Sequence, residues 1–280
     1  MPELPEVETI KTAVEKGIGQ ARIEEVIVRN GSLRLKVPTD LPQKITGAVI
    51  TQYRRIAKYI IIELNNNQSL IWHMGMSGKV KLCDEPPKSF EKHDHIIIRT
   101  SNGVIIYNDP RRFGVLTYCA TDKLSTSPLL AHCGLDPFDK KLTAEYLAGQ
   151  MQKRKKTPVK QILLNQEVVA GIGNIYASEI LYEARISPLR PAANIGLEEC
   201  KTLVTCIRKV LQKAIKAGGS TLRDYKKPDG SLGYFQNMHC VYNKTGQPCP
   251  DCICDIAQTG GIKKTVLGGR STFYCERLQK

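Results

Sequence analysis

The sequence predicts an α+β protein, with an N-terminal antiparallel β-sandwich behind a short helix and a C-terminal helical domain that ends in a β-hairpin. Three observations support this prediction. Ile- and Val-rich segments fill residues 21–120, a long amphipathic helix is expected at 197–217, and the segment after residue 235 is turn-rich and contains cysteines. A chain of 280 residues can form two domains, each with its own core.

The N-terminal domain is expected to begin with a helix at residues 8–18 and to continue as strands. Turn sequences such as Asn30-Gly31 and Pro86-Pro87 separate five segments that are rich in Ile and Val. At least six strands at this spacing predict an antiparallel sandwich or barrel. The five segments are 22–29, 48–64, 69–82, 95–100 and 103–109.

The C-terminal domain follows a connection rich in Ser, Pro, Asp and Lys at residues 121–141. Helices are predicted at 142–152, at 174–184 and, from apolar residues at i, i+3 and i+4 spacing, at 197–217. Gly218 and Gly219 end the last helix. We therefore expect a β-sandwich domain at 1–134, an interdomain connection at 135–151, a helical domain at 152–235 and the hairpin at 236–280.

The net charge of +14 is unevenly distributed along the chain. Residues 1–150 contain 20 Lys and Arg against 17 Asp and Glu, a difference of +3, whereas residues 151–280 contain 21 against 10, a difference of +11. This segregation predicts that mainly the second half binds a polyanion. A cationic surface without a partner is the alternative.

The sequence contains neither a membrane-spanning pattern nor a secretory one. No uninterrupted apolar run approaches the ~20 residues of a membrane span, and no basic region followed by an apolar core opens the chain. We therefore expect no membrane association and a cytoplasmic location, in the cytosol or on the nucleoid.

The first residues suggest covalent chemistry. Removal of Met1 would expose the secondary amine of Pro2, and because an α-amino group titrates near pH ~8, part of it is nucleophilic at neutral pH. Glu3, with Glu6 and Glu8 close by, could donate a proton or orient the amine. The alternative is an acidic segment that caps a first helix.

A glycine-rich turn precedes the helix predicted at 174–184. Backbone amides at such a turn can point at an anion, and Asn174 is a good N-cap. Lys160 and the basic run 153–156 precede this turn and make it a candidate phosphate clamp, although a turn of this kind is usually only a turn.

Two further turns could contact a base stack. Asp109–Gly114 carries Arg111 and Phe113 within a strand pattern, and His73–Gly78 carries two methionines. Such side chains can act as wedges in proteins that distort DNA. The alternative is a salt-bridged turn with Phe113 and the methionines in the core.

Ten cysteines in a chain expected in the cytosol do not indicate disulfides. Four of them crowd the C-terminus and indicate a metal site: Cys249, Cys252, Cys254 and Cys275. The other six are scattered singly and are expected to be small buried hydrophobic residues.

Together these motifs resemble the bacterial formamidopyrimidine-DNA glycosylase family, which excises 8-oxoguanine and ring-opened purines. The resemblance runs from Pro2 to the last residues, and the order and spacing of its motifs are very specific. The related endonuclease VIII branch usually has Gly where this chain has Leu4. The matching segments are PELPEVET at the start, RRIAKY at 54–59, HMGMSG at 73–78, KHDH at 92–95, DPRRFG at 109–114, GIGNIYASE at 171–179, GGSTLRDY at 218–225, GYF at 233–235 and the C-terminal cysteine segment.

The resemblance implies roles for five residues at a catalytic centre. Pro2 is the nucleophile that forms a Schiff base with deoxyribose C1′, and Glu3 is the general acid. Glu6 shapes the lesion pocket. Lys58 contacts the phosphate beside the lesion and assists β-elimination, and Arg270 in the hairpin is the match for the residue assigned to δ-elimination.

The resemblance also implies how DNA is bound. Met76, Arg111 and Phe113 fill the gap left by the flipped nucleotide, with Arg111 facing the orphaned cytosine. The loop at 218–225 closes over the extruded base. His93, Arg111 and Lys155 match DNA-contacting positions, and Asn174 is the clamp residue of a helix–two-turn–helix motif in the domain at 152–235.

The family's zinc-finger-like hairpin usually carries two Cys-x₂-Cys pairs, which form a tetrahedral zinc site. Cys249 and Cys252 form the first pair, and Cys275 opens the second, but Leu278 stands at its partner position. We expect one structural zinc with Cys254 as fourth ligand. The alternatives are His239 or Cys240 as ligand, three thiolates and a water, or a metal-free hairpin.

The sequence thus predicts a bifunctional DNA glycosylase and AP lyase that acts as a monomer on double-stranded DNA containing oxidised purines. No cofactor is expected for catalysis, because the amine itself carries the covalent chemistry. An endonuclease VIII-like glycosylase for oxidised pyrimidines and a non-catalytic damaged-DNA-binding protein are the alternatives.

Overall fold

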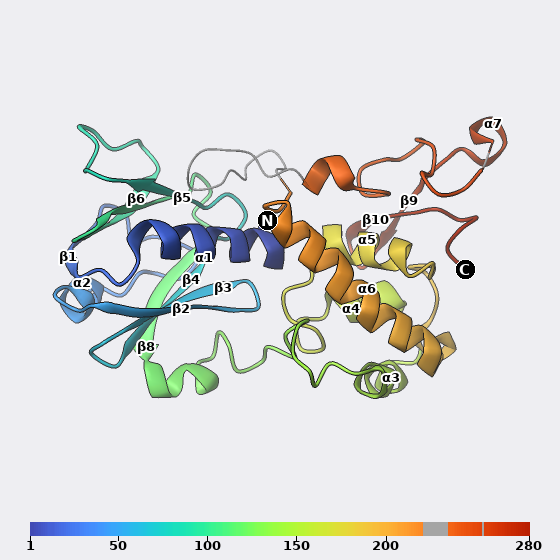
Figure 1. Cartoon of the computed structure of the whole chain (residues 1–280), viewed down its shortest axis with the longest axis horizontal. Helices are drawn as coiled ribbons and strands as arrows, with labels where there is room; N and C mark the ends of the chain where they lie inside the picture. The colour runs from blue at the N-terminus through green and yellow to red at the C-terminus, as the bar shows by residue number, and fades with distance from the viewer. Residues whose placement is uncertain (221–234, 254) are drawn as a thin grey trace. The chain divides into compact units, whose positions relative to one another are not determined.

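The computed structural model describes residues 1–220, 235–253 and 255–280, and the chain forms two compact units. The first unit is Met1–His132 with Ile215–Gln236, and the second is Cys133–Ala214 with Asn237–Lys280. The domain limits predicted at 134, 151 and 235 stay predictions. Figure 1 shows helix α1 and the two larger sheets in the first unit, and α3 to α5 with the C-terminal hairpin in the second.

Two four-stranded antiparallel sheets form the first unit. Their strand orders are β1-β6-β7-β5 and β2-β3-β4-β8. Residues of both sheets share one core, so the arrangement is the predicted sandwich rather than a barrel. The elements are α1 (Leu4–Ile18), β1 (Ile23–Val28), α2 (Leu41–Ile45), β2 (Ile50–Ile56), β3 (Tyr59–Leu64), β4 (Gln68–His73), β5 (Lys79–Cys83), β6 (Asp94–Thr100), β7 (Gly103–Asn108), β8 (Val115–Ala120) and the 3₁₀ helix η1 (Thr121–Thr126).

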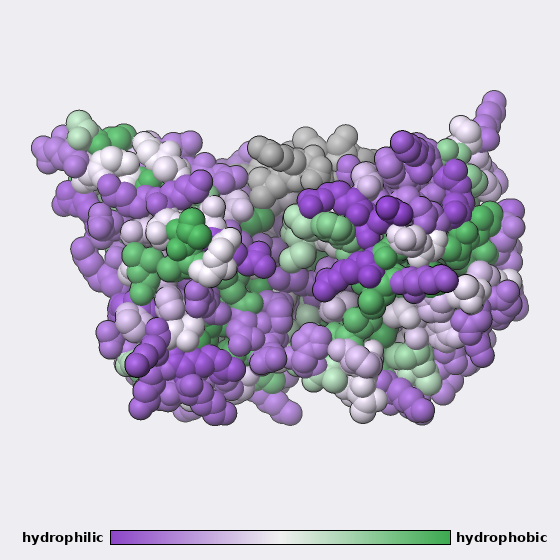
Figure 2. Space-filling model, turned by 180° about the vertical axis from the view of Figure 1, so that it is seen from behind, coloured by the Kyte–Doolittle hydropathy of each residue, from purple (hydrophilic) through white to green (hydrophobic). Residues whose placement is uncertain are grey.

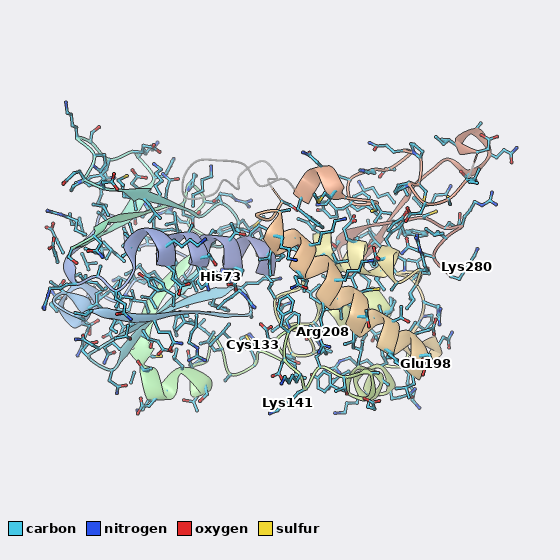
Figure 3. All side chains as sticks on the ribbon, viewed as in Figure 1. His73, Cys133, Lys141, Glu198, Arg208 and Lys280 are labelled. Carbon is cyan, nitrogen blue, oxygen red and sulfur yellow. The ribbon has the colours of Figure 1, made fainter. Side chains whose placement is uncertain are left out.

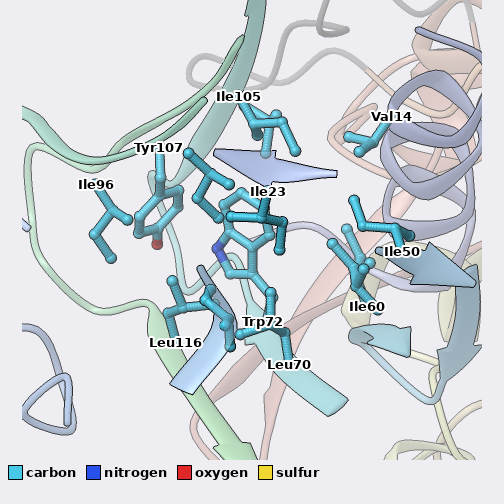
Figure 4. Packing of buried hydrophobic residues seen from close by; sticks show 14 of the residues in the cluster. Val14, Ile23, Ile50, Ile60, Leu70, Trp72, Ile96, Ile105, Tyr107 and Leu116 are labelled. Atoms are coloured by element: carbon cyan, nitrogen blue, oxygen red, sulfur yellow. The ribbon is translucent and has the colours of Figure 1, made fainter. Parts of the chain in front are cut away.

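The core between the sheets explains the long apolar runs of the sequence. Along β3, Ile60 and Ile62 contribute to the central core, whereas Ile61 packs with Leu124 on the opposite face. Because both faces are covered, the strand is apolar throughout instead of alternating. At the centre of the sandwich the rings of Trp72 and Tyr107 meet edge to face at 5.2 Å (Figure 4).

Helix α1 begins at Leu4, four residues earlier than predicted. The Glu6 side chain accepts a hydrogen bond from the backbone N of Glu3 at 2.9 Å, as in a capping box. The remainder of the helix presents one apolar stripe to the core, which consists of Val7, Ile10, Val14 and Ile18.

Two of the predicted strand segments each contain two strands. The segment 48–64 is divided by a turn at Ala57, whose φ of 54° lies in the left-handed region, and the segment 69–82 is divided by the turn after His73. The strand β8 and the short helices α2 and α4 were not predicted. Helix α2 has only five residues, too few for a periodic pattern.

The second unit contains the three predicted helices and the predicted hairpin. A two-residue turn at Gly268-Gly269, both at positive φ, joins β9 to β10. Arg208 on α6 donates to the backbone oxygens of Pro137, Asp139 and Leu142 and fixes the segment that leads into the unit (Figure 3). The elements are α3 (Ala144–Lys153), α4 (Val159–Leu164), α5 (Asn174–Glu183), η2 (Ala192–Asn194), α6 (Leu197–Lys216, whose last two residues belong to the first unit), η3 (Phe235–Met238), α7 (Ile256–Thr259), β9 (Lys263–Leu267) and β10 (Arg270–Tyr274).

The surface is largely hydrophilic on the face that Figure 2 shows, with hydrophobic patches between hydrophilic side chains. Within the described residues, no helix has the length and apolar character that a membrane span requires.

Candidate functional site

The N-terminal end of α1 buries the residues predicted to carry the chemistry. Pro2 is buried, and Glu3 and Glu6 are only 4% and 2% exposed. One carboxylate oxygen of Glu6 accepts from the backbone N of Glu3 and the other from the backbone N of Ser220 at 2.7 Å. Because both oxygens are engaged, Glu6 is fixed and in turn fixes the backbone of its neighbour Glu3.

The approach of Ser220 to Glu6 depends on a glycine. Gly219 has a φ of +75°, and a Cβ placed on it would lie 2.9 Å from Glu6 Oε1. A larger residue here would have a strained backbone conformation and would displace the Glu6 side chain. The predicted loop 218–225 continues from here, but its residues 221–225 lie outside the described part of the chain.

Lys58 lies in the tight turn between β2 and β3 and is 8% exposed. Arg55, two residues before the turn, donates to Glu8 on α1 at 2.7 Å and to the carbonyl of Ala57 at 3.2 Å. These contacts tie the turn that carries Lys58 to helix α1, which directly follows Pro2 and Glu3.

His73, which was not predicted as a site residue, lies beside Lys58. Antiparallel pairing of β3 with β4 places Tyr59 opposite His73, with ring centroids 4.9 Å apart. Burial, together with the charges of Lys58 and Arg34, lowers the pKa of His73 to about 4. Nδ1 of the neutral ring accepts from the backbone N of Gly75 at 3.0 Å, so Nε2 carries the hydrogen and can donate to an anionic oxygen.

We predict that His73 makes stability depend on pH. Its pKa is about 4 in the folded protein against 6.5 ordinarily, so the unfolded state binds more protons between these values, and the free energy of unfolding falls as the pH drops through this window. At most about 2 kcal/mol should be lost between pH 6.5 and 5. Urea denaturation at pH 7 and 5 should show a smaller loss for His73→Gln than for the wild type. The exposed His132→Gln is the control, and equal losses in all three proteins would contradict the prediction.

Asp109 organises the turn that carries Arg111 and Phe113. Its fully buried carboxylate accepts from Ser77 Oγ at 2.6 Å, Tyr107 Oη at 3.1 Å and the backbone N of Gly114 at 2.8 Å. Ser77 belongs to the turn 73–78, so one carboxylate holds both candidate DNA-contacting turns together. Within that turn Gly75, at φ +63°, lies so close to Phe113 that an added Cβ would be 2.4 Å from its carbonyl carbon.

These turns expose the predicted wedge side chains. Met76 is 39% and Phe113 44% exposed, so the alternative that places them in the core is wrong, although Met74 is buried in it. The Arg111 guanidinium lies 4.7 Å from the centre of the Phe113 ring. The carbonyl of His93 accepts from the backbone N of Asp109 at 3.1 Å, which places His93 next to the same turn.

In the second unit, α5 begins at Asn174 with Gly173 rather than Asn174 as its N-cap. Asn174 Nδ2 donates to the carbonyl of Ser271 in β10 at 2.9 Å, and its buried Oδ1 has no partner among the described residues. Lys155 is exposed. Lys160 is not part of a surface clamp, because its fully buried ammonium donates to Thr272 Oγ1 at 2.9 Å and to the Ser271 carbonyl at 3.2 Å.

Helix α5 also holds the backbone of residues 240–242. The buried Glu179 carboxylate accepts from the backbone N atoms of residues 240, 241 and 242 at 2.8, 3.1 and 2.8 Å. Burial raises the pKa of Glu179, although these three donors oppose the shift. Arg270 is exposed as the first residue of β10, directly after the two-glycine turn.

Three cysteines form the candidate metal centre, which we call the thiol cluster: Cys249, Cys252 and Cys275. Their sulfur atoms lie within 4.8 Å of one another, and those of Cys252 and Cys275 are 3.6 Å apart. Tetrahedral zinc with Zn–S bonds of about 2.3 Å requires sulfur atoms about 3.8 Å apart, so the cluster fits this metal. Leu278 packs against the cluster, and Cys254 lies outside the described residues.

Comparison with known proteins agrees with this arrangement. Family models for the formamidopyrimidine-DNA glycosylase N-terminal domain and H2TH domain match residues 1–116 and 133–226. The chain is 45% identical to the formamidopyrimidine-DNA glycosylase of Rhodospirillum rubrum, over 100% of both chains. It therefore belongs to the formamidopyrimidine-DNA glycosylase family.

Two solved structures are similar over the whole chain. A complex of a Lactococcus lactis Fpg variant with DNA containing Fapy-dG superposes with a TM-score of 0.88 at 34% identity, and covers 100% of both chains. A complex of MutM with DNA containing carbocyclic 8-oxo-G superposes with a TM-score of 0.87, at the same identity and coverage. These matches agree with the predicted α+β fold.

Proposed function

We propose that this chain is a bifunctional DNA glycosylase and AP lyase of base excision repair, which removes 8-oxoguanine and formamidopyrimidines from double-stranded DNA. The observation that carries the proposal is the burial of Pro2 and Glu3 side by side at the start of α1, in a chain of this family. The lesions named for the two DNA complexes support this substrate class. The protein acts in the cytoplasm, on the nucleoid.

Base release starts from the Pro2 amine, which removal of Met1 exposes. The amine attacks deoxyribose C1′, the glycosidic C–N bond breaks, and Glu3 protonates the departing base. The C1′–O4′ bond then breaks while O4′ takes up the proton that the amine loses, which gives an iminium. This iminium cannot lose its charge, because a nitrogen derived from a secondary amine keeps no N–H proton. That charge acidifies the C2′ position.

Strand cleavage follows from the same intermediate. Loss of a C2′ proton breaks the C3′–O bond in β-elimination, which Lys58 assists while it contacts the neighbouring phosphate. Neutral His73, beside Lys58, offers a further donor for that phosphate. Arg270 serves δ-elimination, in which the C5′–O bond breaks. Glu6, fixed by Ser220, shapes the pocket for the extruded base.

Lys155 and His93 contact the DNA, and Asn174 is the clamp residue of the helix–two-turn–helix motif. Met76, Arg111 and Phe113 enter the duplex, and Arg111 faces the orphaned cytosine. Their exposure and the rigid turn around Asp109 support this role, because a wedge must be both accessible and fixed.

Replacement of Arg111 by Ala should weaken discrimination of the base opposite the lesion and leave the melting temperature nearly unchanged, because the side chain is exposed. Excision rates from duplexes with cytosine or adenine opposite 8-oxoguanine measure the discrimination. Arg112→Ala, in the same turn, is the matched control. A large loss of stability with intact discrimination would favour a structural role.

The thiol cluster binds one zinc ion, with Cys254 as the fourth ligand. Zinc supplies a structural cross-link here and no step of the reaction. Elemental analysis of protein purified without chelator should give one zinc per chain, and Cys254→Ser should lose it more readily to a chelator than the wild type. Cys206→Ser, far from the cluster in sequence, is the control. Zinc well below one per chain with activity retained would contradict the proposal.

Relative excision rates test the substrate class. Single-turnover excision should be faster from an 8-oxoguanine·cytosine duplex than from a thymine glycol·adenine duplex. The opposite order would favour an endonuclease VIII-like enzyme, and binding without excision of either lesion would indicate a non-catalytic damaged-DNA-binding protein.

A further inference from the structure

A phenol lies against the thiol cluster. Tyr182 is 1% exposed near the end of α5, and its hydroxyl oxygen lies 3.3 Å from Cys249 Sγ. Cys249 is itself 5% exposed, so the contact is shielded from solvent. Tyr182 follows Glu179 by three residues, and these positions lie on neighbouring parts of one helix face. Both side chains therefore hold the C-terminal segment from the same side of α5.

The direction of this hydrogen bond follows from the chemistry of the partners. A metal ligand cysteine is a thiolate and has no proton to donate. A phenol has a pKa near ~10 and keeps its proton at neutral pH. With metal bound, Cys249 can only accept a hydrogen bond, so Tyr182 is the donor in this contact.

Arg185 orients the Tyr182 ring relative to the loop that carries Cys249 and Asp251. Arg185 donates to Asp251 Oδ2 at 2.8 Å while its guanidinium lies 5.0 Å from the centre of the Tyr182 ring. The exposed ion pair contributes little stability by itself. Its geometry nevertheless fixes the Tyr182 ring relative to the loop that carries Cys249.

We propose that Tyr182 is a positioning residue of the metal centre, because its hydroxyl holds the Cys249 thiolate in place for the metal. This inference rests on the zinc site put forward under the proposed function. It applies whichever group completes the coordination, since the hydrogen bond is made to a ligand that belongs to the thiol cluster.

Zinc competition with a chromophoric chelator tests the proposal on the full-length protein. Tyr182→Phe removes only the hydroxyl and should weaken zinc binding by about 10- to 100-fold, the usual effect of losing a hydrogen bond to a metal ligand. In the cobalt-substituted variant the sulfur-to-cobalt charge-transfer band should shift, which a general loss of stability would not cause. Tyr146→Phe is the matched control, because that hydroxyl donates to the Val168 carbonyl at 2.9 Å and belongs to α3.

The outcomes separate this inference from the zinc proposal. A wild type that binds neither zinc nor cobalt would overturn both. A wild type that binds zinc, with Tyr182→Phe unchanged or with Tyr146→Phe equally weakened, would overturn the role of Tyr182 alone. NMR of the cadmium-substituted wild type tests the contact without any substitution. A scalar coupling between the Tyr182 hydroxyl proton and cadmium through the sulfur is expected, and its absence would overturn the hydrogen bond.

Discussion

A dipeptide left in front of Pro2 is expected to abolish both base excision and strand cleavage. In the extended protein the Pro2 nitrogen is an amide, whose lone pair is delocalised into the carbonyl and is not nucleophilic. The new α-amino group would lie two residues before Pro2. Because Pro2 is buried, we do not expect that group to reach the position of the Pro2 nitrogen. Single-turnover assays of the extended and processed proteins on 8-oxoguanine duplexes measure the effect.

The matched control carries the same dipeptide after Lys280, where it leaves the amine unchanged. This protein should retain full activity. Activity of the N-terminally extended protein close to that of the control would show that another group is the nucleophile.

Glu3→Gln should slow base release by ~10²–10⁴-fold, the usual effect of losing a positioned proton donor. The amide has nearly the same shape as the carboxyl group but no acidic proton, so the buried start of α1 should keep its structure. Cleavage of a preformed abasic site needs no protonation of a base and should suffer much less. The ratio of the two rates therefore measures proton donation specifically.

Glu15→Gln provides the control for Glu3→Gln, because Glu15 is exposed near the other end of α1 and pairs with Lys11 at 3.2 Å. Equal slowing of base release and abasic-site cleavage in Glu3→Gln would instead indicate that Glu3 orients the Pro2 amine in both steps.

The sandwich could be predicted because its core leaves a local signal. Strands such as β3 are apolar on both faces, and the stripe of α1 repeats at helical spacing. The turn at Ala57 could not be predicted, because alanine carries no sequence sign of its left-handed conformation. The start of α1 was placed too late because glutamate is not among the usual N-cap residues.

Contacts between residues far apart in sequence explain most of the remaining differences between the predicted and the observed site. Lys160 follows a basic run and was expected on the surface, but its partners lie 111 and 112 residues away in β10. His73 could have been found from the hairpin register alone, since pairing of β3 with β4 brings the motifs at 54–59 and 73–78 together. The role of Asp109 could not be predicted from the sequence, because its three hydrogen-bond partners come together only in the folded turn.

The most direct test of the account is borohydride trapping on an 8-oxoguanine·cytosine duplex, followed by proteolysis and mass spectrometry of the adduct. Reduction of the Schiff base should give one covalent complex, and the sugar remnant should be on the peptide that begins with Pro2. An adduct on a lysine, or base excision without any trapped complex, would contradict the central claim that the secondary amine of Pro2 is the nucleophile.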